Sequence, residues 1–167
     1  MHGTPMPGLH DPQSGKGCGR QGVAIQVRTG PRFLIRFGLI PALEWHAREV
    51  TKRTGLAVRL QADDSADLPD EIKTCIYRIA QEALHNCDRH SRATAVSLHL
   101  LQSPEAVTLT ITDDGRGFDT SRTRGLGLLG MSERVERLGG RMVIESQPGQ
   151  GTRILIKLPL PALQAAA

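Results

Sequence analysis

The chain has 167 residues, which is room for one ordinary domain and a tail, and its 39% hydrophobic and 23% charged content favours a globular core over global disorder. Aromatic residues make up only 3%, which argues against a stacking platform for single-stranded nucleic acid, and three cysteines without a CxxC pair argue against a disulfide framework or a cysteine zinc site. The net charge of +4 lies entirely on residues 1–36, because residues 37–167 carry sixteen basic and sixteen acidic side chains; the domain therefore has no basic character that would direct it to DNA.

Residues 1–36 are predicted to form an irregular basic tail. The first thirty residues contain seven glycines and three prolines and show no period beyond a short extended piece at Val23–Val27. We expect the domain over residues 37–160 and a flexible end over residues 161–167. No apolar run reaches the ~18 residues of a membrane span, and the start lacks a signal-peptide core, so we expect a cytoplasmic chain, although a full-length parent could be anchored in a membrane.

Hydrophobic periodicity then predicts three helices and five strands in the order helix, strand, helix, two strands, helix, two strands. The predicted helices are Ala42–Arg53, opened by Pro41 and stopped by Gly55; Glu71–His90, capped by Asp70; and Leu126–Leu138. The predicted strands are Ala57–Gln61, Ala93–Gln102, Ala106–Asp113, Arg141–Ser146 and Thr152–Leu158. This order indicates an α+β fold, a two-layer α/β sandwich with a mixed sheet and helices on one face.

The long helix carries a polar face that does not suit a plain core. Glu82, Asn86, Arg89 and His90 stand at steps i, i+4, i+7 and i+8, and Asn86 and His90 fall within the arc of the apolar stripe. Polar groups that face a core need partners. Either the helix end emerges from the core with these groups solvated, or they line a site.

The strand before the glycine-rich loop ends on an inward carboxylate. The alternation that turns Val107, Leu109 and Ile111 inward does the same for Asp113, and nothing in the strand supplies a hydrogen-bond donor. Asp113 either caps its own turn or binds a ligand. The segment that follows, Asp113–Gly117, has two glycines, which allow the backbone to turn close to a bound group.

A second glycine cluster, Gly125–Gly130, spells GxGxxG. A dinucleotide-binding interpretation requires a strand directly before this motif, whereas residues 114–124 form a polar loop, so that match is interpreted as accidental. The glycines still leave free backbone amides at a helix start, where phosphate binds. Together these features predict a nucleotide pocket in which Asp113 accepts from a purine amino group, Asn86 binds Mg²⁺ and Glu82 orients or deprotonates a reacting group.

These segments resemble the motifs of one ATPase superfamily in the family's order. Residues 81–90, QEALHNCDRH, resemble the N box shared by gyrase, MutL and sensor histidine kinases, and residues 113–119, DDGRGFD, resemble its DxGxG box. Residues 125–134, GLGLLGMSER, resemble the second glycine box, followed by LGG at 138–140 and GQGT at 149–152. The residues within these motifs are most similar to those of NarL-type two-component sensor kinases, and the resemblance runs from about Gly38 to Pro159.

The resemblance implies a Bergerat-type ATP-binding fold with ATP and Mg²⁺ as ligands. By carry-over, Asp113 contacts the adenine amino group, Asn86 binds Mg²⁺, and Glu82 is the acid of the N box. The other nucleotide-binding positions it implies are Arg89, His90, Gly115, Gly117, Gly125, Leu126, Gly127, Leu128, Gly130 and Thr152. The function implied is phosphoryl transfer from ATP to a histidine supplied by another domain or chain, with a response regulator downstream.

Two features depart from the family pattern. NarL-type kinases carry the acceptor histidine on a helical hairpin before the ATP domain, and no such run is found here; His10 lies between Gly8 and Pro12, where no helix could hold it. Asp88 stands where the family tends to be apolar or small. An anti-sigma-factor type serine kinase and a nucleotide-binding regulatory module without transfer activity remain as alternatives.

Overall fold

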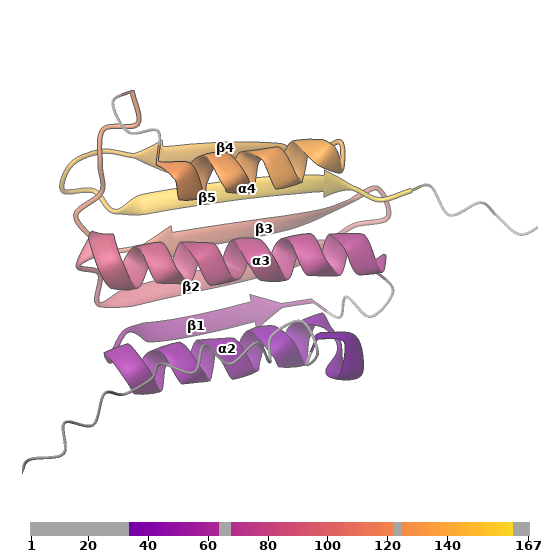
Figure 1. Cartoon of the computed structure of the whole chain (residues 1–167), viewed down its shortest axis with the longest axis horizontal. Helices are drawn as coiled ribbons and strands as arrows, with labels where there is room; N and C mark the ends of the chain where they lie inside the picture. Colours follow the sequence, from indigo (N-terminus) through magenta and orange to yellow (C-terminus); the bar gives the residue numbers. More distant parts are fainter. Residues whose placement is uncertain (1–33, 64–67, 122–124, 162–167) are drawn as a thin grey trace, which may run out of the picture.

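A computed structural model describes residues 34–63, 68–121 and 125–161. Its elements in chain order are α2 (Leu39–Thr54), β1 (Ala57–Ala62), α3 (Asp70–Asn86), the π-helical turn η1 (Cys87–Ser91), β2 (Ala95–Gln102), β3 (Ala106–Asp113), α4 (Leu126–Arg137), β4 (Arg141–Ser146) and β5 (Thr152–Pro159). The strands form one sheet in the order β1-β2-β3-β5-β4, in which only β1 and β2 run parallel. The helices α2, α3 and α4 lie side by side on one face of this sheet (Figure 1). The predicted α+β sandwich is confirmed.

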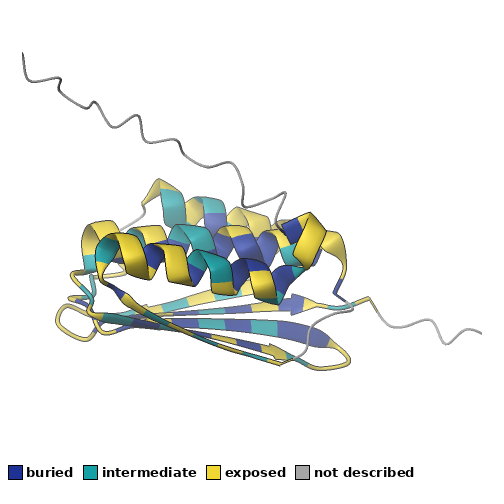
Figure 2. Ribbon diagram, turned by 90° about the horizontal axis from the view of Figure 1, so that it is seen from below, coloured by how far each residue is buried: buried dark blue, intermediate teal, exposed yellow. Residues whose placement is uncertain are grey.

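The core lies between the helices and the inner face of the sheet (Figure 2). The stripe of α3 that periodicity marked as apolar is buried, with Ile79 fully enclosed, and it packs against inward side chains such as Leu109 and Ile156. Each fully buried side chain of this size contributes about 1.5–3 kcal/mol relative to an exposed one. This packing holds the polar end of α3 at a fixed distance from the ends of β3 and β5.

Two strands have the predicted bounds, and several other ends differ. β3 and β4 begin and end as predicted, whereas β1 and β5 are one residue longer, β2 begins two residues later, and α4 ends one residue earlier. The prediction that Asp70 caps α3 is wrong. Pro69 occupies the N-cap without a side-chain hydrogen bond, and Asp70 is the first helical residue. Proline restricts φ and thereby favours the extended backbone that leads into the helix, and acidic side chains are favourable in the first turn because of the helix dipole.

The first helix starts earlier than predicted. α2 begins at Leu39 after Gly38, whose φ of 88° lies in the left-handed region, and Pro41 stands within its first turn. Residues 34–37, assigned in part to the tail, form a helical turn with Leu34 buried in the core. Gly55 ends α2 as predicted, in the left-handed conformation, with its N–H bonded to the Thr51 carbonyl at 2.9 Å.

The interpretations of Val23–Val27 and His10 concern positions outside the described residues, as does most of the predicted tail. Across the described ranges, no helix combines the length and the apolar character needed to cross a membrane.

Candidate nucleotide site

A cavity of about 590 Å³ opens between the C-terminal end of α3, η1, the loop after β3 and the start of α4. The structure thereby brings together segments that lie up to seventy residues apart in the chain. Its wall contains most of the predicted site residues: Glu82, Asn86, Arg89, His90, Asp113, Gly117, Gly125, Leu126, Gly127, Leu128 and Thr152. Two predicted residues, Gly115 and Gly130, are not among the residues that line the cavity.

Asp113 lines the cavity and is only 8% exposed. Its Oδ1 accepts a hydrogen bond from the Gly115 N–H at 2.8 Å, so the donor that the strand lacks comes from the following loop. Its Oδ2 lies 3.7 Å from Sγ of Cys87, a thiol that also lines the cavity. Burial, reinforced by the Asp113 carboxylate, raises the pKa of the Cys87 thiol to about 12. Cys87 is therefore a neutral donor that helps to hold the carboxylate in place.

The loop after β3 is fixed by glycine at a place where a side chain would not fit. Gly117 has a φ of 58°, and a Cβ at this position would lie 2.7 Å from the carbonyl oxygen of Gly151. Ser146 joins the two loops, since its Oγ donates to the Gly151 carbonyl at 2.8 Å and accepts from the Phe118 N–H at 3.0 Å. The hydroxyl of Thr152 lies 3.1 Å from the same Oγ. The end of the sheet and the loop thus form one wall of the cavity.

The start of α4 lies over the polar face of α3. A Cβ added at Gly127 would collide with Oε1 of Glu82 and stand 3.6 Å from Nδ2 of Asn86. The glycine thus allows the backbone of α4 to approach both side chains. The N-cap residue Gly125 makes no side-chain capping bond, so no side chain at the N-cap satisfies the first amides of α4, and the first residues of this helix line the cavity.

The prediction that α3 continues as an α-helix to His90 is wrong. The α-helix ends at Asn86, and residues 87–91 form the wider turn η1, closed by Arg92 in the left-handed conformation with φ 54°. A π-helical turn departs from the spacing of 100° per residue on which the prediction rested, and such turns are frequent at functional sites. Arg89 and His90 nevertheless line the cavity.

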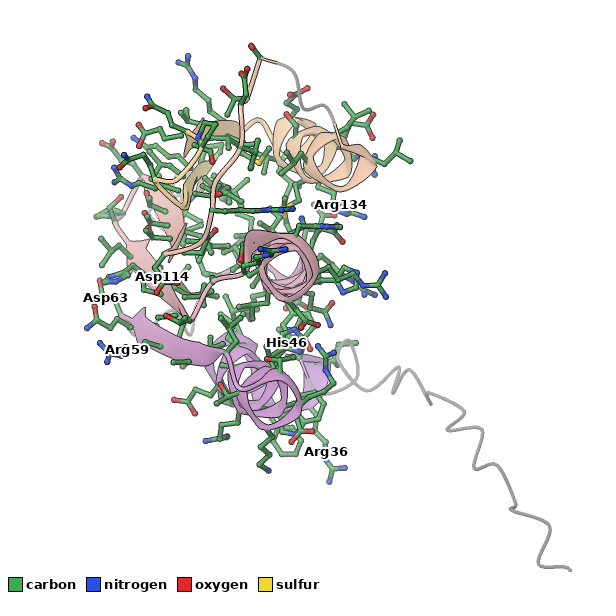
Figure 3. All side chains as sticks on the ribbon, turned by 90° about the vertical axis from the view of Figure 1, so that its left-hand side faces the viewer. Arg36, His46, Arg59, Asp63, Asp114 and Arg134 are labelled. Atoms are coloured by element: carbon green, nitrogen blue, oxygen red, sulfur yellow. The ribbon has the colours of Figure 1, made fainter. Side chains whose placement is uncertain are left out.

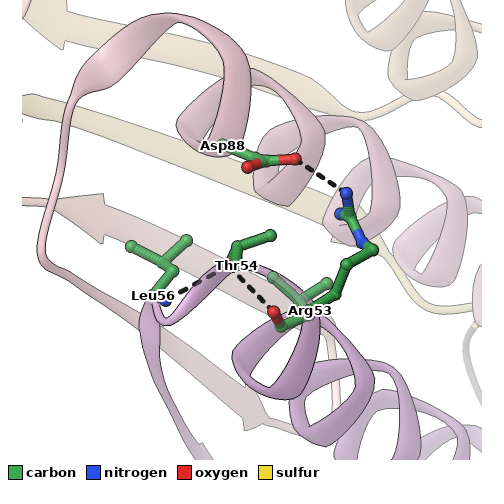
Figure 4. A network of polar contacts seen from close by, with 5 residues as sticks. Arg53, Thr54, Leu56 and Asp88 are labelled. Atoms are coloured by element: carbon green, nitrogen blue, oxygen red, sulfur yellow. Dashed lines mark hydrogen bonds and ion pairs between the residues drawn. The ribbon is translucent and has the colours of Figure 1, made fainter.

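Asp88 anchors η1 to the neighbouring helix. Its Oδ2 accepts from Arg53 at 3.0 Å, at the end of α2, as Figure 4 shows. In the same figure, Oγ1 of Thr54 donates to the Val50 carbonyl and accepts from the Leu56 N–H, which fixes the turn into β1. The unusual acid at position 88 therefore has a structural partner outside the cavity.

A second carboxylate, Asp114, fastens the loop to the adjacent strand. Its Oδ1 accepts from the N–H groups of Thr94 at 2.8 Å and Ala95 at 2.9 Å, and its Oδ2 accepts from the Thr94 hydroxyl at 2.5 Å. Figure 3 shows Asp114 at the sheet, away from the helix layer. These bonds, with that of the Thr94 hydroxyl foremost, lower the pKa of Asp114 below its ordinary value of 3.8.

This depressed pKa predicts an acid-dependent contribution to stability. Because the folded-state pKa lies below the unfolded value of 3.8, the contribution of Asp114 is complete above that pH and is lost as the pH falls through the folded-state pKa. We expect Asp114→Asn to lower the free energy of unfolding at pH 7 and to match the wild type more closely at low pH. Urea unfolding across this pH range measures the difference, and a gap that is constant with pH would contradict the assignment.

Several residues of the cavity were not predicted from the sequence. Cys87, Ser91, Arg116 and Phe118 all line it, and the hydroxyl of Ser146 supports its wall. The position of Arg116 between Gly115 and Gly117 was a sequence signal that could have identified it. Cys87 and Ser91 lie on η1, where a helical wheel with 100° per residue assigns side chains to the wrong direction. The role of Ser146 depends on hydrogen bonds between a strand and two loops, which a local sequence pattern does not indicate.

Comparison with known proteins agrees with this geometry. Residues 71–162 match the model of the family described as histidine kinase-, DNA gyrase B- and HSP90-like ATPases. The chain belongs to this family. It is 35% identical over 126 residues to the signal transduction histidine-protein kinase/phosphatase DegS of Brevibacillus brevis, an alignment that covers 74% of this chain and 33% of that protein. It is 32% identical over 140 residues to the oxygen sensor histidine kinase NreB of Staphylococcus carnosus, covering 81% of this chain and 40% of NreB.

Solved structures of this ATPase family also match the fold. The blue-light activated histidine kinase of Erythrobacter litoralis EL346 superposes with a TM-score of 0.63 at 28% identity, covering 77% of this chain and 43% of that one. The chain spans about a third of the length of DegS. The resemblance inferred from the motifs is confirmed: the domain is an ATP-binding catalytic domain of the sensor histidine kinase type. The roles of its individual site residues stay predictions.

Proposed function

We propose that this domain binds ATP with Mg²⁺ and transfers the γ-phosphoryl group to a histidine supplied by another domain or chain. The observation that carries the proposal is one buried carboxylate, Asp113, in the wall of a cavity that Glu82, Asn86 and the start of α4 also line. In this proposal Asp113 serves the base, and the residues of α3 and α4 serve the phosphates. We further propose that the phosphorylated partner passes the group to a response regulator.

The residues divide into two groups by the role that we propose for each. Asp113 accepts the exocyclic amino group of adenine, since its Oδ2 has only the weak thiol donor of Cys87 among the described residues. The amides at the start of α4, together with Arg89 and His90, which line the same cavity, are the groups that we propose to bind the phosphate chain. The nitrogen of the incoming imidazole forms a bond to the γ-phosphorus as the bond from phosphorus to the bridging oxygen of ADP breaks. Glu82 orients that imidazole or takes its proton.

The cavity also suits a magnesium ion. Mg²⁺ keeps several waters and phosphate oxygens as ligands and takes only one or two from the protein. The described residues contain no cluster of three acidic, histidine or cysteine side chains, whereas Asn86 offers a neutral oxygen within the cavity, one turn from Glu82. When bound, the ion neutralises the charge that develops on the phosphates. Asn86 is the side chain that we propose to hold it.

Asn86→Ala is expected to remove the Mg²⁺ dependence of ATP binding. Loss of a group that supports a metal typically lowers metal affinity by about 10–100-fold. Calorimetric titrations of ATP with Mg²⁺ and with EDTA should therefore give similar affinities in this variant and different ones in the wild type. Gln81→Ala is the control, because Gln81 lies on the same helix and bonds the Tyr77 hydroxyl outside the cavity. If the Asn86→Ala variant keeps the wild-type response to Mg²⁺, Asn86 does not hold the ion.

The transfer itself is tested in trans. The chain is incubated with γ-labelled ATP and a separately supplied helical hairpin domain that carries an acceptor histidine, and the label on the hairpin is followed over time. We expect acid-labile, base-stable label on the hairpin, as for a phosphorylated histidine. Tight ATP binding with no label on any supplied acceptor would favour a nucleotide-binding regulatory module, and acid-stable label on a serine would favour a serine kinase.

A further inference from the structure

The face of the sheet opposite the helices carries an arrangement of charge that the nucleotide site does not use. All three helices pack on the other face (Figure 3), and Arg141 of β4 and Lys157 of β5 stand directly opposite each other on the open one. Both are exposed. Like charges paired across strands are destabilising. None of the ion pairs formed by the described residues includes either cation.

The pairs that follow along the two strands complete a small surface, here called the β4–β5 face. Val143, 38% exposed, stands opposite Leu155, and Glu145 pairs with Arg153 at 3.4 Å. An apolar centre between charged rims is typical of a surface that binds another protein. The β4–β5 face consists of Arg141, Val143, Glu145, Arg153, Leu155 and Lys157.

A hollow of about 310 Å³ lies at the end of this face, where the chain turns from α4 into β4. Arg141 and Lys157 both line it, together with the backbone of Gly139 and Gly140. Its one carboxylate, Glu105, forms no ion pair with either cation. The hollow thus has two cations against one carboxylate in its lining, an excess of positive charge that suits one incoming anionic group.

We propose that the β4–β5 face docks an acidic segment of a partner protein, with one carboxylate seated between Arg141 and Lys157. Charge complementarity argues for this occupant. A second copy of the chain that docked through the same face would bring the same two cations against them. The chain's own residues outside the described ranges are poor candidates, since residues 162–167 contain no acid, residues 122–124 contain two basic side chains, and residues 1–33 contain four basic side chains against one acidic. Residues 64–67 contain two acids, but they follow β1, the strand at the opposite edge of the sheet from β4.

The docking surface is separate from the nucleotide cavity. Arg141 begins β4 and Lys157 lies near the end of β5, whereas Ser146 and Thr152, at the other ends of these strands, adjoin the cavity. Five residues of strand span about 17 Å. The side chains of the two sites also point to opposite faces of the sheet. ATP and the partner should therefore bind independently, and this proposal does not rest on the proposed function.

The test uses the full chain and a fluorescein-labelled peptide of twelve residues in which glutamate alternates with serine. Fluorescence anisotropy should show binding that weakens as salt rises, because the contacts are exposed charges. Arg141→Glu with Lys157→Glu should lower the affinity by about tenfold or more, since two exposed ion pairs become repulsive. Arg48→Glu with Lys52→Glu, on the exposed side of α2, is the matched control and should bind like the wild type.

A milder pair, Arg141→Gln with Lys157→Gln, guards against misfolding. It should lose peptide affinity while its melting temperature stays at or above that of the wild type, because the repulsion between the two cations is removed. Unchanged peptide affinity in both sheet variants, an equal loss in the α2 control, or displacement of the peptide by MgATP would overturn the proposal. Tighter binding of a DNA duplex or of phosphatidylserine vesicles, lost in the same variants, would assign the face to nucleic acid or membrane and overturn it as well.

Discussion

Replacing Asp113 by alanine should lower the affinity for ATP roughly ten- to a hundredfold, since a hydrogen bond to a buried charged group is worth about 1.5–3 kcal/mol. Asp113 is the one buried carboxylate among the described residues that line the cavity, and the Gly115 N–H and the Cys87 thiol hold it in a fixed orientation. The substitution removes the acceptor for the adenine amino group and leaves a polar void. Calorimetric titration with MgATP measures the loss.

A second variant separates recognition of the base from damage to the fold. Asp113→Asn retains an oxygen for the Gly115 N–H but replaces the carboxylate by a weaker acceptor, so it should reduce the preference for ATP over ITP, which lacks the amino group. Glu105→Ala, a carboxylate at the opposite end of the sheet, should leave both affinities unchanged. ATP affinity that survives both changes at Asp113 would mean that the base binds elsewhere.

Glu82→Gln should separate binding from chemistry. The substitution preserves the shape of the side chain beside Gly127, so ATP affinity should stay within about twofold of the wild type. Transfer to a supplied hairpin should fall by about 10²–10⁴-fold, the usual contribution of a positioned general base. The measurement is the single-turnover rate of label transfer at saturating MgATP.

The matched control for this change is Glu71→Gln, an exposed acid in the first turn of the same helix. It should transfer at the wild-type rate. If Glu82→Gln also transfers at that rate, the polar face at the end of α3 is simply a solvated helix end and the chemistry lies with other residues.

The sequence alone was sufficient for the layers of the fold and for most of the cavity. β3 and β4 have their predicted bounds because strong local signals, the Ser103-Pro104 turn and the glycine pair at 139–140, stand at their ends. Alternation along β3 placed Asp113 inward correctly, since a period of two leaves no choice once Leu109 is buried.

The parts that could not be predicted depend on contacts between distant segments. The turn η1 cannot be read from a helical period, because a π-helical turn departs from the spacing of 100° per residue that the period assumes. The hydrogen bond from the Cys87 thiol to the Asp113 carboxylate joins residues 26 positions apart. The ion pair of Arg53 with Asp88 joins residues 35 apart, and it accounts for an acid that the family pattern left unexplained.

The central claim is that ATP binds in the cavity between α3, the loop after β3 and the start of α4. A titration of isotopically labelled protein with MgATP, followed by amide chemical shifts, tests it most directly. We expect the largest changes at Gly115, Gly127 and Thr152, while Thr110, which points to the open face of the sheet, stays unchanged. Changes that cluster on the open face, or none at millimolar MgATP, would contradict it.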